Sequence, residues 1–282
     1  MATLSILNHD RKIFDKKYIY PVLSRRAGGL SLGINLNTNN ACNWQCIYCE
    51  IPNLTRGKPE SIDTKLLKEE LFFWLHEITQ NNFLGNHAPP DTLLKDIAFS
   101  GNGEPTAAKE FEEVINIVIT AINEFKLNNL ITIRLITNGS YMSDQSVQNA
   151  WSLINQTPKE VWFKIDSATK EGIDRINQVS GTESSALKRL DITANHCPTY
   201  IQTCVFTYEG KKPSNADKKA YIELLSEAIN RKIPLKGVLL YGVERPSLLP
   251  EASNKITKLP EEWLVSFADQ IRSTGVPVKI SV

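Results

Sequence analysis

Strand-like apolar runs alternate with amphipathic helical patterns almost from one end of this 282-residue chain to the other. The predicted strands are residues 31–37, 96–100, 131–137, 161–166, 200–206 and 235–243, with a possible last one at 276–280. The predicted helices are residues 63–78, 107–125, 171–177, 184–195, 214–230 and 260–273, and one that Ser143 caps and that carries Val147, Trp151 and Ile154.

Repeated strand–helix units predict parallel strands with helices outside them. About six such units are fewer than the eight of a closed barrel, so we expect an α/β fold, a partial (β/α)6 TIM-like barrel. The segments 85–90 and 251–258 are interpreted as loops. We predict a single domain over residues 1–282, with a basic leader at 1–30, the barrel core at 31–250 and a C-terminal helix and strand at 251–282.

The charge of the chain is nearly balanced, with 32 basic and 31 acidic residues. Nothing in this balance demands nucleic acid or a membrane as partner. A local basic cluster precedes the first predicted strand, and short charge runs of this kind are usually solvated; it consists of Arg11, Lys12, Lys16, Lys17, Arg25 and Arg26. No run approaches the ~20 apolar residues of a membrane span, and residues 1–10 do not resemble a signal peptide. We therefore expect a cytoplasmic protein.

Three of the five cysteines lie within eight residues, with the spacing C-x3-C-x2-C over Cys42, Cys46 and Cys49. Such crowding in a cytosolic chain indicates metal binding and not a disulfide framework. Thiolates suit iron–sulfur clusters or zinc, but a structural zinc site uses four ligands. Three thiolates on a [4Fe–4S] cluster leave one iron without a protein ligand, as a catalytic site requires. The spacing favours this cluster; zinc completed by a distant ligand is the alternative.

Polar residues and glycines follow several of the predicted strands. The sequence Ser-Gly-Asn-Gly-Glu-Pro-Thr at residues 100–106 predicts a sharp turn whose backbone can approach a ligand closely. Asn138 ends the third strand, and Lys164 and Asp166 share one side of the fourth. Polar strand ends in such barrels usually surround a ligand. A structural ion pair between Lys164 and Asp166 is the alternative.

These motifs together resemble the radical S-adenosylmethionine (SAM) superfamily, whose signature is this cysteine spacing with an aromatic residue before the last cysteine, here Tyr48. The resemblance implies that the open iron chelates SAM and that one electron cleaves the sulfonium to methionine and a 5′-deoxyadenosyl radical. It also implies contacts with the SAM amino group in the glycine turn, and with its ribose and carboxylate at the strand ends. The residues implicated are Gly101, Asn102, Gly103, Glu104, Asn138, Lys164 and Asp166.

Two further stretches, residues 20–26 and 241–246, narrow the resemblance to a group similar to the radical SAM enzymes of wybutosine synthesis in tRNA. The resemblance runs from about Tyr18 to Ser247. It supports the cofactor chemistry more strongly than it supports a particular substrate. Arg245 could grip a carboxylate or phosphate, or form a surface salt bridge. Gln202 and Cys204 alternate onto one strand face. Cys204 could donate hydrogen to a product radical, or be a small buried hydrophobe.

The leading hypothesis is a radical SAM enzyme that abstracts hydrogen from an unidentified nucleoside, tRNA or small metabolite. It would take electrons from a partner such as flavodoxin or ferredoxin. Tight tRNA binding is not expected, because a large RNA footprint needs clustered Lys and Arg. A non-catalytic iron–sulfur binding or sensing protein is the alternative, and a zinc-stabilised nucleic-acid binder the third. With only Cys197 and Cys204 left over, a second cluster is not expected.

Overall fold

The computed structural model describes residues 4–5 and 14–281. The long strands join into one sheet in the order β1-β2-β5-β6-β7-β8-β10-β12, so the predicted α/β fold, a partial TIM-like barrel, is confirmed. The strands of this sheet are β1 (Ile19–Ser24), β2 (Gly29–Ile34), β5 (Leu94–Phe99), β6 (Thr132–Thr137), β7 (Lys159–Lys164), β8 (Thr199–Val205), β10 (Leu235–Gly242) and β12 (Val278–Ser281). Short strands are β3 (Ala41–Cys42), β4 (Thr55–Arg56), β9 (Thr207–Tyr208) and β11 (Ile256–Thr257).

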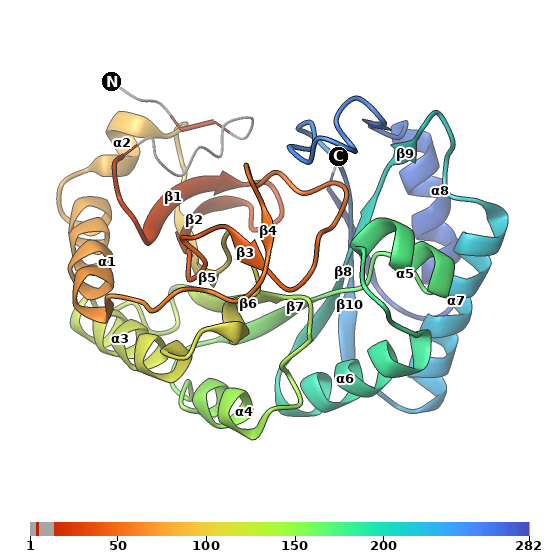
Figure 1. Cartoon of the computed structure of the whole chain (residues 1–282). Helices are drawn as coiled ribbons and strands as arrows, with labels where there is room; N and C mark the ends of the chain where they lie inside the picture. Colours follow the sequence, from red (N-terminus) through yellow and green to blue (C-terminus); the bar gives the residue numbers. More distant parts are fainter. Residues whose placement is uncertain (1–3, 6–13, 282) are drawn as a thin grey trace. The chain divides into compact units, whose positions relative to one another are not determined.

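Two compact units make up the chain. The first comprises Met1–Ala41, Lys58–Ile136 and Asp144–Glu160. In it β1 pairs antiparallel with β2, while β2, β5 and β6 run parallel. Its helices are α1 (Thr64–Thr79), α2 (Phe83–His87), the 3₁₀ turn η1 (Pro105–Ala107), α3 (Phe111–Glu124) and α4 (Gln145–Ser152). Figure 1 shows α1 and α3 lying against this part of the sheet. The apolar side chains predicted along α1 and α3 face its core: Leu67, Leu71, Trp74, Val114, Ile115 and Val118 are at most 2% exposed.

The second unit comprises Cys42–Gly57, Thr137–Ser143 and Val161–Val282. Here β7, β8, β10 and β12 run parallel, and the short strands β9 and β11 pair antiparallel. Its helices are α5 (Lys170–Asn177), α6 (Glu183–His196), α7 (Asn215–Asn230) and α8 (Glu261–Arg272). α7 packs between α6 and α8 (Figure 1). Parallel pairing brings the carboxyl ends of these strands to one edge of the sheet, where Lys164, Gln202 and Tyr241 lie on neighbouring strands.

Helix starts follow from the capping residues in the sequence. Asp63 accepts a hydrogen bond from the Leu66 amide and begins α1, and Ser214 forms a reciprocal capping box with Asp217 at the start of α7. Such caps are worth about 0.5–2 kcal/mol each. These boundaries lie within a residue or two of the predicted ones, as the position of the cap dictates.

Three expectations about local structure are wrong. Residues 19–24, within the predicted leader, form the buried strand β1, because Tyr20 packs its ring over Gly33 across the antiparallel pair. The predicted loop at 85–90 begins inside α2, which Asn82 starts in a left-handed conformation. Asp144 and not Ser143 precedes α4, and this helix ends at Ser152, before Ile154. Of the basic cluster, Arg11 and Lys12 lie outside the described residues.

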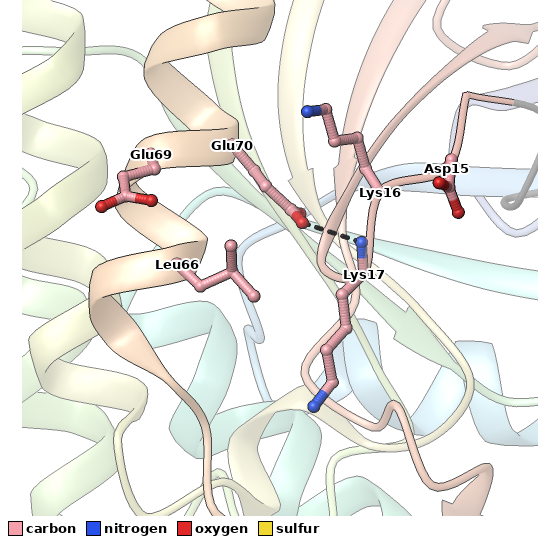
Figure 2. A pocket seen from close by; sticks show the side chains of 6 residues that line it. All are labelled: Asp15, Lys16, Lys17, Leu66, Glu69 and Glu70. Atoms are coloured by element: carbon pink, nitrogen blue, oxygen red, sulfur yellow. Dashed lines mark hydrogen bonds between the residues drawn. The ribbon is translucent and has the colours of Figure 1, made fainter.

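A buried carboxylate ties the start of β1 to α1. Glu70 is 5% exposed. Its Oε1 accepts a hydrogen bond from the Lys17 amide at 2.9 Å, and its Oε2 accepts from the Tyr18 and Ile19 amides at 2.7 and 3.1 Å. Figure 2 shows Glu70 pointing at the Lys17 backbone, while Glu69 points away from it. Glu70 therefore accepts hydrogen bonds from three successive backbone amides, at the first residue of β1 and at the two residues before it.

Glu70→Gln is expected to destabilise the fold by about 1–3 kcal/mol. A glutamine places an amide NH2 where a carboxylate oxygen accepts, so at least one buried backbone N–H loses its acceptor. Chemical denaturation measures the change in unfolding free energy. Glu69→Gln is the matched control on the same helix, and it should change stability by less than about 0.5 kcal/mol. Equal effects of the two substitutions would show that Glu70 does not anchor the strand.

Candidate active site

The three clustered cysteines lie on one loop of the second unit, the cysteine loop (residues 42–50). Cys42 ends β3, and its carbonyl accepts a hydrogen bond from the Gly57 amide at 3.0 Å. The Cys49 amide donates to the Cys46 carbonyl at 2.9 Å, which makes a tight turn between these two residues. All three side chains are thiols of intermediate exposure. The loop thus presents three soft donors from one short stretch of backbone.

The last turn of α5 holds the cysteine loop on both sides of Cys46. The Gln45 amide donates to the Asn177 carbonyl at 3.2 Å, and the Ile47 amide donates to the Ile176 carbonyl at 2.8 Å. These carbonyls belong to a helix C-terminus and lack partners within the helix. The loop amides therefore provide hydrogen bonds to carbonyls at the helix end, and the same hydrogen bonds fix the loop.

The segment after β10 holds the other end of the cysteine loop. Ser247 Oγ donates to the Ile47 carbonyl at 2.6 Å, and the Leu248 amide donates to the Cys49 carbonyl at 2.9 Å. Arg245, predicted as an anion-binding residue, places its Nε and Nη2 each 2.6 Å from Oε2 of Glu50. In this structure Arg245 thus forms the salt bridge that was the alternative expectation, and a contact with a ligand stays a prediction.

Asp166 is the centre of a polar network at the carboxyl ends of β7 and β8. Its side chain is fully buried, and its Oδ1 accepts a hydrogen bond from the Cys204 amide at 3.0 Å. Its Oδ2 accepts from Tyr48 Oη at 2.6 Å and from Asn177 Nδ2 at 2.8 Å. Lys164 Nζ lies 3.9 Å from the same oxygen and also donates to Tyr48 Oη. The predicted pairing of Lys164 and Asp166 is therefore present, and both carboxylate oxygens are engaged by protein groups.

The network keeps Lys164 charged and Tyr48 neutral. Burial alone would lower the pKa of Lys164, but Asp166, Tyr241, Cys46 and Cys204 together outweigh it, with Asp166 contributing most, and the pKa is raised. Burial and the charge of Asp166 raise the pKa of Tyr48. The Lys164 ammonium also lies 4.7 Å from the centre of the Tyr48 ring, a cation–π distance. The aromatic residue of the cysteine motif is thereby fixed against β7.

Burial raises the pKa of the Cys46 thiol to about 12; Lys164 opposes this shift, and Asp166 adds to it. A thiol must lose its proton to ligate a metal, so metal binding at Cys46 would release a proton at neutral pH. The thiol already receives a hydrogen bond from Asn177 Nδ2, at 3.3 Å. The Trp44 amide similarly donates to Cys42 Sγ at 3.4 Å.

The two β8 residues predicted for the site differ in environment. Gln202 is 2% exposed and its Nε2 donates to Tyr241 Oη at 3.2 Å, but its Oε1 receives no hydrogen bond from any described residue. Cys204 lies in an apolar cluster with Ile47, Phe206 and Leu249. This is the surrounding expected of a small buried hydrophobe, and hydrogen donation by Cys204 stays a prediction.

Asn138 follows β6, and its Nδ2 donates to Asn43 Oδ1 at 2.8 Å. Its own Oδ1 accepts from the Ser140 amide at 3.0 Å, which closes a turn. Gly139 at this turn has φ +77°, and a Cβ there would overlap the Phe163 ring. Asn138 thus belongs to the second unit together with the cysteine loop.

The predicted glycine turn lies in the first unit. A Cβ on Gly101 would overlap the Asn35 side chain, and one on Gly103 would overlap the Ala41 carbonyl and the Asn37 amide. Glu104 is 2% exposed and caps η1 through the Thr106 amide at 3.2 Å. Among the described residues, two buried acceptors next to this turn, Asn37 Oδ1 and Asn102 Oδ1, receive no hydrogen bond. The turn therefore needs both glycines, because a side chain at either position would overlap its neighbours.

The donor set, three cysteine thiols on one loop, has the chemistry that an iron–sulfur cluster requires. Within residues 4–5 and 14–281, no three His, Cys, Asp or Glu side chains are grouped so as to hold one metal ion. In the same part of the chain, no helix is both long and apolar enough to cross a bilayer.

Comparison with known proteins identifies sequence relatives of this chain. No established family profile matches the sequence. A UPF0026 protein of Helicobacter pylori (strain J99 / ATCC 700824) is 31% identical over 246 residues, which are 87% of this chain and 70% of that protein. A GTPase Obg of Brachyspira hyodysenteriae is 30% identical over 151 residues, which are 51% of this chain and 19% of that protein. The chain thus matches less than a fifth of the length of that relative.

Solved structures show the same architecture at low identity. A radical SAM methyltransferase from Sphaerobacter thermophilus has a TM-score of 0.58 at 13% identity, covering 90% of this chain and 66% of that one. A structure of TYW1 with a lysine–pyruvate adduct bound has a TM-score of 0.56 at 17% identity, covering 86% of this chain and 73% of that one. The chain therefore has the fold of these two proteins, as the resemblance to radical SAM enzymes implied. By sequence, it belongs to the UPF0026 family.

Proposed function

We propose that this protein is a radical SAM enzyme whose Cys42, Cys46 and Cys49 hold a [4Fe–4S] cluster. The observation that carries the proposal is the cysteine loop itself, in which three soft thiols are pinned from both sides by α5 and by Ser247. When bound, the cluster supplies one electron for the reductive cleavage of SAM to a 5′-deoxyadenosyl radical. The protein's own residues, in α5 and at Ser247, hold the loop in position.

Lys164 and Asp166 act in this proposal chiefly as positioning residues. Asp166 orients Tyr48 and Asn177 against the cysteine loop, and Lys164 neutralises the buried carboxylate. Gln202, with an acceptor that no described residue satisfies, can accept a hydrogen bond from a hydroxyl or amino group of SAM or substrate. Asn138 keeps its predicted role in holding SAM.

The glycine turn of the first unit would hold the amino end of SAM. The buried acceptors Asn37 Oδ1 and Asn102 Oδ1 fit the donors of an ammonium group. Glu104 supplies negative charge beside them, and Gly101 and Gly103 let the backbone come close.

Gly103→Ala is expected to weaken SAM binding about tenfold, because a misfit of about 1–3 kcal/mol must be relieved by moving the turn. Isothermal titration of the reconstituted protein with SAM measures the affinity. Gly181→Ala is a matched control, because its new Cβ meets only Ile173 Cγ2, at 3.3 Å. Unchanged SAM affinity in Gly103→Ala, with iron content intact, would remove the turn from the binding site.

The substrate in this proposal is a nucleoside, a tRNA or a small metabolite, and the electron donor a flavodoxin- or ferredoxin-type protein in the cytoplasm. The formal charge of +1 argues against a large RNA footprint. A protein with 6–10 phosphate contacts loses about 10³–10⁵ in affinity between 50 and 200 mM salt. Filter binding to bulk tRNA across that salt range should therefore show only weak retention.

Anaerobic reconstitution with iron and sulfide, followed by electron paramagnetic resonance with and without SAM, tests the proposal. A reduced [4Fe–4S] signal that changes when SAM is added is the expected result. A signal that SAM does not alter would indicate the alternative, an iron–sulfur binding or sensing protein. Zinc in place of iron after expression and reconstitution would exclude both.

A further inference from the structure

Asn177 stands between Asp166 and the middle cysteine of the loop. It is 2% exposed, and it is the last residue of α5. Its Nδ2 lies 3.3 Å from Cys46 Sγ and 2.8 Å from Asp166 Oδ2. An amide nitrogen carries two hydrogens, so one can be given to the sulfur and the other to the carboxylate.

The orientation of this amide is fixed by its surroundings. Asp166 Oδ2 receives the Asn177 amide, and the same carboxylate is held by Tyr48 Oη and by the Cys204 amide. The Asp166 carboxylate is held in place by these bonds and can only accept hydrogen bonds. The nitrogen of the Asn177 side chain, and not its oxygen, therefore lies next to the sulfur. The N–H···S contact is therefore determined by three elements, β7, β8 and α5.

Holding the loop in place does not require this side chain. The backbone carbonyls of Ile176 and Asn177 bind the loop amides on either side of Cys46. They remain when the side chain is replaced, as does the Ser247 contact with Ile47. The Asn177 amide thus acts on the sulfur itself, and its removal leaves the main attachments of the loop intact.

We propose that Asn177 raises the reduction potential of the cluster by donating a hydrogen bond to the Cys46 thiolate. This inference rests on the proposed function. Hydrogen bonds to the ligating sulfurs and solvent exposure are among the factors that set cluster potentials. When the cluster takes up one electron, negative charge on the thiolate increases and the N–H···S bond strengthens. The bond therefore stabilises the reduced form more than the oxidised form.

Asn177→Ala and Asn177→Leu test the inference, because both remove the donor while leucine keeps a similar volume. The reconstituted proteins are titrated anaerobically with dithionite in the presence of redox dyes, which gives the midpoint potential from the visible absorbance. Both variants should shift to a lower potential, by up to about tenfold in the ratio of oxidised to reduced cluster, or about 59 mV for a one-electron couple. The control is Asn195→Ala, which removes an exposed asparagine near the end of α6.

Each result has a distinct meaning. A lower potential in both variants, with wild-type iron content and an unchanged Asn195→Ala protein, supports the inference. A wild-type potential in both variants overturns it and leaves the proposed function standing. Failure of both variants to hold iron also overturns it, because the amide would then be needed to build the site and not to tune it. Absence of a cluster in the wild-type protein would instead contradict the proposed function.

Discussion

Cys46→Ala is expected to abolish the brown iron–sulfur chromophore. Cys46 lies at the middle of the cysteine loop, and among the described residues there is no further thiol in this loop to replace it beyond Cys42 and Cys49. Loss of groups that only orient a metal ligand costs about 10–100-fold in metal affinity, so loss of a ligand itself should cost more. Iron and acid-labile sulfide per chain, together with visible absorbance, measure the result.

Cys197→Ala is the matched control for this experiment. Cys197 is 4% exposed and caps the C-terminal end of α6, away from the cysteine loop in the sequence. Its variant should retain the iron content of the wild-type protein. Full iron content in Cys46→Ala, or an equal loss in both variants, would contradict the assignment of the ligands.

Asp166→Ala is expected to destabilise the protein by about 3–5 kcal/mol, the cost of removing one partner from a buried ion pair. The substitution leaves the Lys164 ammonium, whose side chain is 17% exposed, without its carboxylate. It also removes the acceptor of three hydrogen bonds, from Tyr48, Asn177 and the Cys204 amide. Denaturant unfolding of the apo protein measures the change in free energy.

Asp174→Ala, an exposed position on α5, is the control and should change stability by less than about 0.5 kcal/mol. Asp166→Ala combined with Lys164→Met should recover part of the loss, because no unpaired buried charge remains. The pKa of Lys164 is raised, so its contribution to stability is fully present below its unfolded pKa of about 10.4. It is lost only as the pH rises further. Loss of this Lys164 contribution in the wild-type protein between pH 6 and 9 would contradict this assignment.

Much of the fold could be predicted from sequence, because the local apolar pattern marks the same strands that pair in the parallel sheet. The six predicted strands and the possible last strand correspond to β2, β5, β6, β7, β8, β10 and β12. β1 could not be predicted, because the packing of Tyr20 over Gly33 and the capture of its amides by Glu70 are long-range contacts. The start of α2 depends on a left-handed Asn82, which leaves little signal in the pattern.

The candidate site likewise contains residues that could be predicted from the sequence and residues that could not. The cysteines and the glycine turn could be found from the sequence because their spacing is local. Asn177, Ser247 and Arg56 could not, because each reaches the cysteine loop from a distant segment or through a backbone carbonyl; Arg56 Nη1, for example, donates to the Asn43 carbonyl at 3.2 Å. Asn37 could not be identified from the sequence either, because its oxygen lacks a hydrogen bond only in the folded chain, where Gly103 and Ala41 lie beside it.

Reductive cleavage of SAM is the reaction that the proposed function assigns to this protein. The most direct test is the formation of 5′-deoxyadenosine and methionine when the anaerobically reconstituted protein is mixed with SAM and dithionite, quantified by liquid chromatography and mass spectrometry. Substrate is not needed for a slow, uncoupled cleavage to be detected. The wild-type protein should form 5′-deoxyadenosine in equal amount to methionine, and Cys46→Ala should form none. A fully reconstituted cluster that binds SAM but yields no 5′-deoxyadenosine would contradict the proposed function.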